Sequence, residues 1–214
     1  MVASLLVCKR ARRARCGQTI RTKQSLRLLD IPDKNGHYPL MHACVKLDAE
    51  YILLNHGAKV DATTETGRTA LMVAAGCGFK KACVLLVDAG ANVNTRDNKC
   101  SVLHKAIDSN NVDTVVYLLQ KGAKATEPDN QNWTPLFRAV SVNCHPDIIK
   151  SLIDHGADVN VTDKEGTSAL AMSVIHGNLA SAQHLIRAGA DIHTTTKHGK
   201  TLLQLASASG RNVS

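Results

Sequence analysis

One cysteine stands directly before a histidine, at Cys144 and His145, and this pair is the first candidate for chemistry. A thiolate beside an imidazole base can act as a nucleophile, and the same two side chains can bind a metal ion. Adjacent residues in a turn diverge, however, and so cannot easily act together. The other interpretation is a turn between two helices that contains one extra residue. We favour this second interpretation and expect neither a catalytic nor a metal site.

The remaining residues that could do chemistry form no recognisable motif. The seven cysteines include no pair with the C-x₂₋₄-C spacing of a zinc site, and their odd number does not suggest a disulfide framework. We therefore expect a reducing compartment, either the cytoplasm or the nucleus. No G-x-S-x-G elbow, Walker-type glycine loop or H-E-x-x-H motif is present. These observations predict a protein that is not an enzyme and needs no cofactor.

A repeated pattern explains where most histidines and glycines lie. The segment DHGADVNVTDKEGTSAL (154–170) is echoed at 55–71, 88–103 and 187–203. A glycine and a leucine each recur with a period of about 33 residues, which is typical of stacked helix-turn-helix units. The glycines are Gly57, Gly90, Gly122, Gly156 and Gly189, and the leucines are Leu40, Leu71, Leu103, Leu136, Leu170 and Leu203.

Each period contains the start and end signals of two helices. A serine or threonine that can cap a helix stands two residues before the leucine in five of the six cycles. A second, amphipathic helix follows, as in residues 112–123, and the recurring glycine is suited to ending it. The predicted capping residues are Thr69, Ser101, Thr134, Ser168 and Thr201.

The motifs YPLMHA, TALMVAA, SVLHKA and WTPLFRA resemble the T-P-L-H-x-A core of ankyrin repeats, and LLVDAGANVN and LIDHGADVN resemble their closing segment. This resemblance covers residues 33–214. It implies an all-α ankyrin-repeat solenoid of helix-turn-helix units joined by β-hairpin loops, with about five full units and a partial sixth. Three departures from the pattern occur in a characteristic order: DIPDKNG opens the array, Leu-His falls in the third unit, and WTPLFR with an extra residue falls in the fourth. This order resembles the ankyrin half of proteins that join a fibronectin type III domain to ankyrin repeats.

The resemblance implies a non-enzymatic scaffold or adaptor, because ankyrin-repeat proteins usually bind other proteins. Their partners contact the hairpin tips and the concave surface of the first helices. We expect a monomer that binds protein, with no membrane contact and a mixed or mildly acidic partner. By register, the predicted binding residues are Glu65, Arg68, Lys99, Asp108, Asn130, Gln131, Trp133, Ser141, Lys164, Glu165, His176, Lys197, His198 and Lys200.

Trp133, the only tryptophan, occupies a position that the repeat does not reserve for a large ring. An exposed tryptophan there would be a good interface anchor. Alternatively, its ring folds over a neighbouring hairpin, and both interpretations stay open. The same position in the other repeats holds His37, Arg68, Cys100, Thr167 and Lys200.

Asn94 and Asn160 end the two closing segments quoted above. They resemble asparagines that a hydroxylase modifies in ankyrin-repeat proteins. The competing interpretation, which we favour, is that these asparagines only stabilise the hairpin turn.

The positive charge of the chain is concentrated near its start. Residues 1–32 contain eight lysines and arginines and one acid, and so account for most of the net charge of +8. We expect a disordered basic tail over 1–32, with a degenerate helix at 25–29, followed by the repeat domain over 33–214. Within the tail, a candidate nuclear-import patch consists of Lys9, Arg10, Arg12, Arg13 and Arg15.

Two other interpretations of the tail stay open. Residues 1–29 contain no acid, which also fits a mitochondrial presequence. The tail could instead contact nucleic acid while the repeats recruit a protein, which would make the chain a nuclear regulator.

Overall fold

The computed structural model describes residues 29–46 and 50–208 of the 214-residue chain. The basic patch at residues 9–15 lies outside the described residues, as does all of the predicted helix at 25–29 except Leu29. The chain divides into two compact bodies, Met1–Ser109 and Asn110–Ser214, called the N-terminal and C-terminal bodies below. Each described helix has at most nine residues, and none could cross a membrane, which takes about 20.

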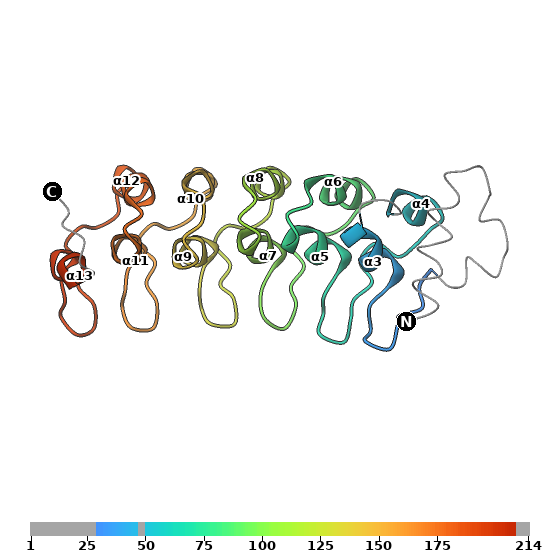
Figure 1. Ribbon diagram of the computed structural model, residues 1–214, viewed down its shortest axis with the longest axis horizontal. Helices are drawn as coiled ribbons and strands as arrows, with labels where there is room; N and C mark the ends of the chain where they lie inside the picture. Colours follow the sequence, from blue (N-terminus) through green and yellow to red (C-terminus); the bar gives the residue numbers. More distant parts are fainter. Residues whose placement is uncertain (1–28, 47–49, 209–214) are drawn as a thin grey trace. The chain divides into compact units, whose positions relative to one another are not determined.

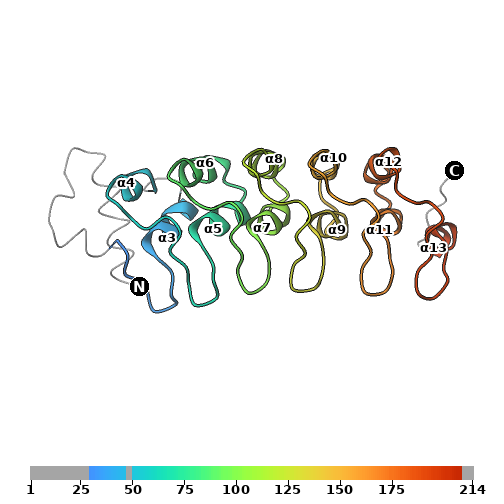
Figure 2. The same ribbon diagram turned by 180° about the vertical axis from the view of Figure 1, so that it is seen from behind.

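The N-terminal body consists of helices in two rows (Figures 1 and 2). The first helices of successive repeats, α3, α5 and α7, lie beside the hairpin loops, while the second helices, α4 and α6, lie on the far side. Helix α5 packs against α3, α6 and α7, and α4 packs against α3 and α6. The helices are α3 (Pro39–Lys46), α4 (Glu50–Asn55), α5 (Ala70–Gly76), α6 (Lys80–Asp88) and α7 (Val102–Asp108).

The C-terminal body repeats this arrangement (Figure 1). Helices α9, α11 and α13 form the row beside the loops, and α8, α10 and α12 form the outer row. Helix α11 packs against α9 and α13, and α10 packs against α8 and α12. The helices are α8 (Val112–Gln120), α9 (Pro135–Ser141), α10 (Pro146–Asp154), α11 (Ala169–His176), α12 (Leu179–Arg187) and α13 (Leu202–Ala208).

The recurring leucine of the sequence marks the core of each repeat. Leu40, Leu71, Leu103, Leu136 and Leu170 are at most 2 % exposed. Leu203 in the sixth repeat is 79 % exposed, because α13 has no second helix beside it among the described residues. The recurring glycines also behave as predicted: all five have φ between +82° and +93°, the left-handed conformation that ends a helix.

Four of the five predicted caps are formed. The hydroxyls of Thr69, Thr134, Ser168 and Thr201 each accept a hydrogen bond from the backbone N–H three residues ahead. Ser101 was predicted wrongly, because its hydroxyl bonds to Nδ1 of His104 at 2.8 Å instead of to the helix backbone. A histidine at the third helical position therefore competes for the hydroxyl, which the spacing alone does not show.

Replacing Thr134 by valine should lower the free energy of unfolding by about 1 kcal/mol, because Phe137 N–H loses its partner at the start of α9. Urea unfolding followed by circular dichroism measures this loss. Since Ser101 makes no such bond, Ser101→Val provides a contrast at the same repeat position, in which only the bond between the Ser101 hydroxyl and the His104 ring is lost. An unchanged midpoint for Thr134→Val would show that the cap contributes no stability.

All six described hairpin loops are closed in the same way. The first residue of each loop donates its backbone N–H to the carbonyl of the position that Trp133 occupies, here called the tip slot. The side-chain oxygen of that first residue accepts the slot's own N–H in return. The pairs are Asp33 and His37, Thr64 and Arg68, Asp97 and Cys100, Asp129 and Trp133, Asp163 and Thr167, and Thr196 and Lys200.

Asp33 makes the first loop sensitive to acid. Its side chain is 4 % exposed and lies 3.0 Å from Nε2 of His42. Burial acts to raise the pKa of Asp33, but bonds from His37 N–H, Asn35 N–H and the His42 ring lower it from 3.8 to about 2. The carboxylate thus favours the folded state above about pH 4, and this contribution disappears as the pH falls through about 2.

We expect Asp33→Asn to be less stable than the wild type at pH 6, with the difference shrinking between pH 4 and pH 2. Urea unfolding of both proteins at pH 6, 4, 3 and 2 measures this change, and using the difference removes the contribution of other carboxyl groups. A difference that stays constant over this range would show that the ionised form of Asp33 does not contribute.

Candidate functional site

Cys144 and His145 point in different directions and form no catalytic pair. Cys144 is 2 % exposed in the core, whereas the side chain of His145 is 55 % exposed. The Nδ1 atom of His145 accepts the N–H of Asp147 at 3.3 Å and so caps α10. The turn between α9 and α10 has four residues, against three between α5 and α6 and between α7 and α8, which confirms the predicted extra residue.

The other cysteines and histidines of the described residues do not converge either. His104 is fully buried and bonded to Ser101, so its role is structural. Cys83 is buried on α6, and this burial raises the pKa of its thiol to about 12, which leaves it a weak nucleophile. Within residues 29–46 and 50–208, no three His, Cys, Asp or Glu side chains could share a metal ion.

The predicted binding residues of the N-terminal body lie mostly in solvent. Glu65 and Lys99 are exposed in the second and third hairpin loops, and Asp108 is exposed at the end of α7. Arg68 is partly buried at the tip slot. The two loops are joined by a hydrogen bond from the N–H of Asn98 to the carbonyl of Thr66, which fixes the spacing of their side chains.

The C-terminal body presents the larger group of predicted residues. Asn130 and Gln131 of the fourth loop are exposed, and so are the predicted residues of the fifth and sixth loops, Lys164, Glu165, Lys197, His198 and Lys200. Ser141 and His176, on the first helices, are partly buried. The Nδ1 atom of His176 lies 3.1 Å from the carbonyl oxygen of Val140, so this ring also ties α11 to α9.

Trp133 is partly buried, so both interpretations of its ring stay open. Its centroid lies 5.4 Å from that of Phe137, and the Arg138 guanidinium lies 6.0 Å from the tryptophan ring. Arg138 in turn approaches Asp129 with 3.4 Å between Nη1 and Oδ2. The ring therefore packs against its own repeat while part of the residue stays exposed, which suits a preorganised anchor.

Side-chain contacts between the loops and the first helices were not predicted from the sequence. In three repeats, the first residue of the loop contacts a basic residue on the first helix: Asp33 with His42, Asp97 with Lys105, and Asp129 with Arg138. At Asp97, burial acts to raise the pKa, but the N–H groups of Cys100 and Lys99 and the Lys105 ammonium lower it overall. A basic residue eight or nine positions after the loop aspartate was the signal that could have shown these pairs.

Asn160 has a structural hydrogen bond. Its side-chain oxygen accepts the N–H of Asp191 at 2.9 Å, which ties the fifth repeat to the sixth. Asp30 and Asp61 use their carboxylates in the same way, bonding the N–H groups of Lys59 and Asn92. This shared pattern favours the structural interpretation of Asn160. At Asn94, the backbone N–H donates to the side chain of Asn92 at 2.9 Å.

The fifth and sixth loops carry a cluster of cations. Within the described part of the chain, the ammonium groups of Lys164, Lys197 and Lys200 contact no acid. The fifth loop also contains Asp163, whose carboxylate closes the loop, and Glu165, which lies 3.9 Å from Nε2 of His198. The backbone N–H of Lys197 bonds to the carbonyl of Glu165 and holds the two tips together. This end of the C-terminal body is thus suited to an acidic segment.

Models of ankyrin repeats match residues 6–97, 93–163 and 152–206 of this chain. The first match begins inside the predicted tail, so the boundary at residue 33 stays a prediction. Neither model supports the fibronectin type III domain that the order of departures suggested. The ankyrin repeat domain of Bcl-3 has the same fold, with a TM-score of 0.76 at 26 % identity over 95 % of this chain and 92 % of that one. This match confirms the predicted all-α ankyrin-repeat solenoid.

Similar proteins come from different biological settings. A fowlpox virus protein that carries the ankyrin-repeat name is 35 % identical over 56 % of this chain and 36 % of its own length. Human Notch homolog protein 1 is 36 % identical over 51 % of this chain but only 4 % of its own length. The yeast protein named for the 26S proteasome regulatory subunit p28 is 29 % identical over 68 % of this chain and 67 % of its own length. The chain thus spans a small part of the first two.

Proposed function

This chain belongs to the ankyrin-repeat family, whose domains are usually non-catalytic, and we propose that it is a protein–protein interaction scaffold with no enzymatic activity of its own. The proposed binding surface comprises the hairpin tips and the solvent-facing side of the first helices. In the C-terminal body this surface carries both a large aromatic ring and a group of unpaired cations. We also propose a monomer that works in the cytoplasm or the nucleus.

The observation that carries this proposal is Trp133 at the tip slot. Asp129, the first residue of the loop, holds the backbone of this slot, and the first residue of every other described loop does the same. In the fifth and sixth loops the slot is filled by residues as different as Thr167 and Lys200. The loop geometry therefore does not require a tryptophan. A large, partly exposed ring held by Phe137 and Arg138 loses little conformational entropy when it meets a partner.

The cations of the fifth and sixth tips indicate what the partner contributes. Lys164, Lys197 and Lys200 follow Trp133 within the same body, and the same two loops contain two acids, Asp163 and Glu165. We propose a partner segment that places an apolar residue against Trp133 and acidic residues against these lysines. Charges at the rim of an interface mainly raise the association rate, and salt weakens this effect because it screens exposed charges.

Affinity capture from cells tests the proposal. The full chain, Trp133→Ala and Thr134→Val are used as parallel baits, and the captured proteins are compared by mass spectrometry. We expect proteins that bind the wild type and Thr134→Val but are depleted with Trp133→Ala. An identical set for all three baits would overturn the role of Trp133.

Two further proposals concern residues that the binding surface does not use. If the basic patch at residues 9–15 contacts nucleic acid, salt-sensitive retention of the chain on heparin should disappear when residues 1–32 are deleted.

If Asn94 or Asn160 is hydroxylated, mass spectrometry of the protein from cells should show the added oxygen. Unmodified asparagines would leave only their roles in the hairpin.

A further inference from the structure

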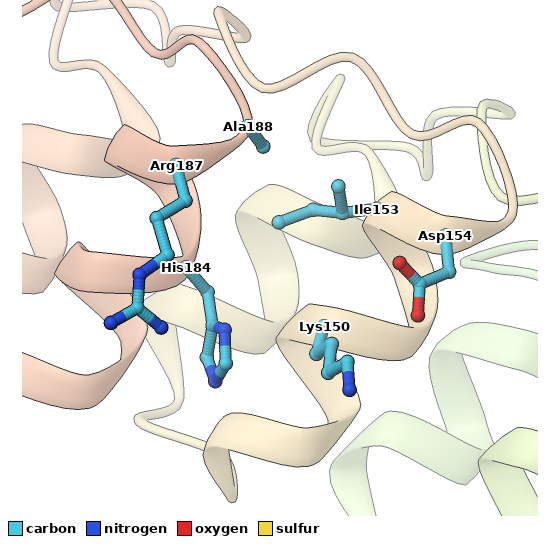
Figure 3. A pocket seen from close by; sticks show the side chains of 6 residues that line it. All are labelled: Lys150, Ile153, Asp154, His184, Arg187 and Ala188. Carbon is cyan, nitrogen blue, oxygen red and sulfur yellow. The ribbon is translucent and has the colours of Figure 1, made fainter.

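A groove between the outer helices α10 and α12 of the C-terminal body carries charges that the repeat fold does not use. It has a volume of about 280 Å³ and is lined by Lys150, Ile153, Asp154, His184, Arg187 and Ala188. Figure 3 shows Ile153 and Ala188 facing each other between the helices, with the polar side chains around them. Since α10 and α12 lie in the row away from the loops, this groove is separate from the hairpin tips (Figure 1).

None of the four ionisable side chains of the groove is satisfied within the described residues. Lys150, Asp154, His184 and Arg187 have no ion pair and no side-chain hydrogen bond there. His184 and Arg187 project side by side from α12, whereas Lys150 and Asp154 project from successive turns of α10 (Figure 3). With a neutral imidazole the four groups have a net charge of +1, and His184 adds a further N–H donor.

The three nitrogen-bearing side chains are departures from the repeat. The outer helices α6, α8, α10 and α12 each have nine residues and align without gaps. Where α12 has Arg187, the other three helices have Asp88, Gln120 and Asp154. Where α12 has His184, they have Leu85, Tyr117 and Ser151, and where α10 has Lys150, the others have Val84, Val116 and Gln183. Three departures that converge on one groove are not explained by the fold.

We propose that this groove is a second binding site, which takes the carboxylate side chain of an acidic segment in a protein partner. The guanidinium of Arg187 can bind both oxygens of a carboxylate, while Lys150 adds a point charge and His184 an N–H donor. The methylene groups of a glutamate then lie over Ile153 and Ala188, which form the apolar floor. The carboxylate of Asp154 repels an anion that carries more than one charge, so a single carboxylate fits the groove better than a free phosphate.

Binding to the groove can be mapped with the ¹⁵N-labelled full chain. The probe is an acetylated and amidated pentapeptide with glutamate at its second and fourth positions, and its control is the same peptide with glutamine. We expect the backbone amides of residues 150–154 and 184–188 to shift with the glutamate peptide and not with the glutamine peptide. The shifts should diminish when salt is raised, because exposed charges are screened.

Variants then assign the effect to the groove cations. The double variant Lys150→Gln with Arg187→Gln should raise the Kd of the glutamate peptide by about 5-fold, as expected for the loss of two exposed charge contacts. Asp154→Asn should lower the Kd of the glutamate peptide by about 2-fold, because a repelling carboxylate is removed. Lys164→Gln removes an equally unpaired cation from the fifth hairpin loop and should leave the groove shifts unchanged.

Several outcomes would overturn the proposal. These are equal shifts with both peptides, full affinity in the double variant, or tighter binding of inorganic phosphate than of the glutamate peptide. Shifts confined to residues 164–167 and 197–201 would also overturn it, because they belong to the hairpin surface. Conversely, Trp133→Ala should leave the groove shifts intact, so the two sites can fail independently.

Discussion

Trp133→Ala is expected to weaken the binding of a partner to the hairpin surface by about 2 kcal/mol, or about 30-fold in Kd, while the chain remains folded. The ring is the largest side chain at any described tip slot, and it is held in place before binding by Phe137 and Arg138. An alanine there removes the apolar contact with the partner and leaves the loop closure by Asp129 intact. Isothermal titration calorimetry with a captured partner measures the change.

The packing of the ring adds a second expectation. Because Trp133 is partly buried against Phe137, its removal should also lower the free energy of unfolding, by about 1 kcal/mol. Thr134→Val is the matched control, since it should lose a similar amount of stability one residue away and keep the ring. If both variants lose the partner to the same extent at 25 °C, reduced folding and not the ring explains the loss. If Trp133→Ala lowers the free energy of unfolding but leaves the affinity for the partner unchanged, Trp133 is only part of the architecture.

Leu136→Ala should lower the free energy of unfolding by about 3 kcal/mol, the largest effect on stability among the substitutions proposed for this chain. Leu136 is fully buried at the start of α9, and its removal leaves a cavity between helices that cannot close without moving. The same repeat position in α13 holds Leu203, which is 79 % exposed. Leu203→Ala should therefore change stability by less than about 0.5 kcal/mol.

Urea unfolding of the two leucine variants gives a direct comparison, because they share residue type and position in the repeat. Equal losses would show that the edge at α13 is covered in solution. A small loss for Leu136→Ala would contradict the close packing of α9 in the C-terminal body. Since a repeat array can unfold in parts, two spectroscopic signals should be followed to test whether one transition describes the chain.

Much of the fold was predictable from periodic residues. The recurring leucines mark the core, and the recurring glycines mark helix ends, because each performs a local task that depends on residue type and spacing. The threonine caps were predictable for the same reason. Ser101 shows the limit, since a histidine three residues ahead provides a better partner than the helix N–H groups.

Contacts between separate elements were harder to predict. The support of Trp133 by Phe137 and Arg138 depends on how a loop folds back on the next helix. The groove of Lys150 and Arg187 depends on which faces of two outer helices meet, 37 positions apart in the chain. The separation of buried Cys144 from exposed His145 was the exception, because the divergence of adjacent residues in a turn anticipates it.

The closure of the hairpin loops has a consequence for how a binding surface on this chain could change. At every described tip slot both backbone groups are hydrogen-bonded to the first residue of the loop, whatever side chain the slot carries. Cys100 turns inward and Lys200 outward without altering this closure. If the tip slots contact partners as proposed, a point mutation at a slot can change recognition while the backbone closure of the loop is kept, so that specificity can evolve without a change of fold.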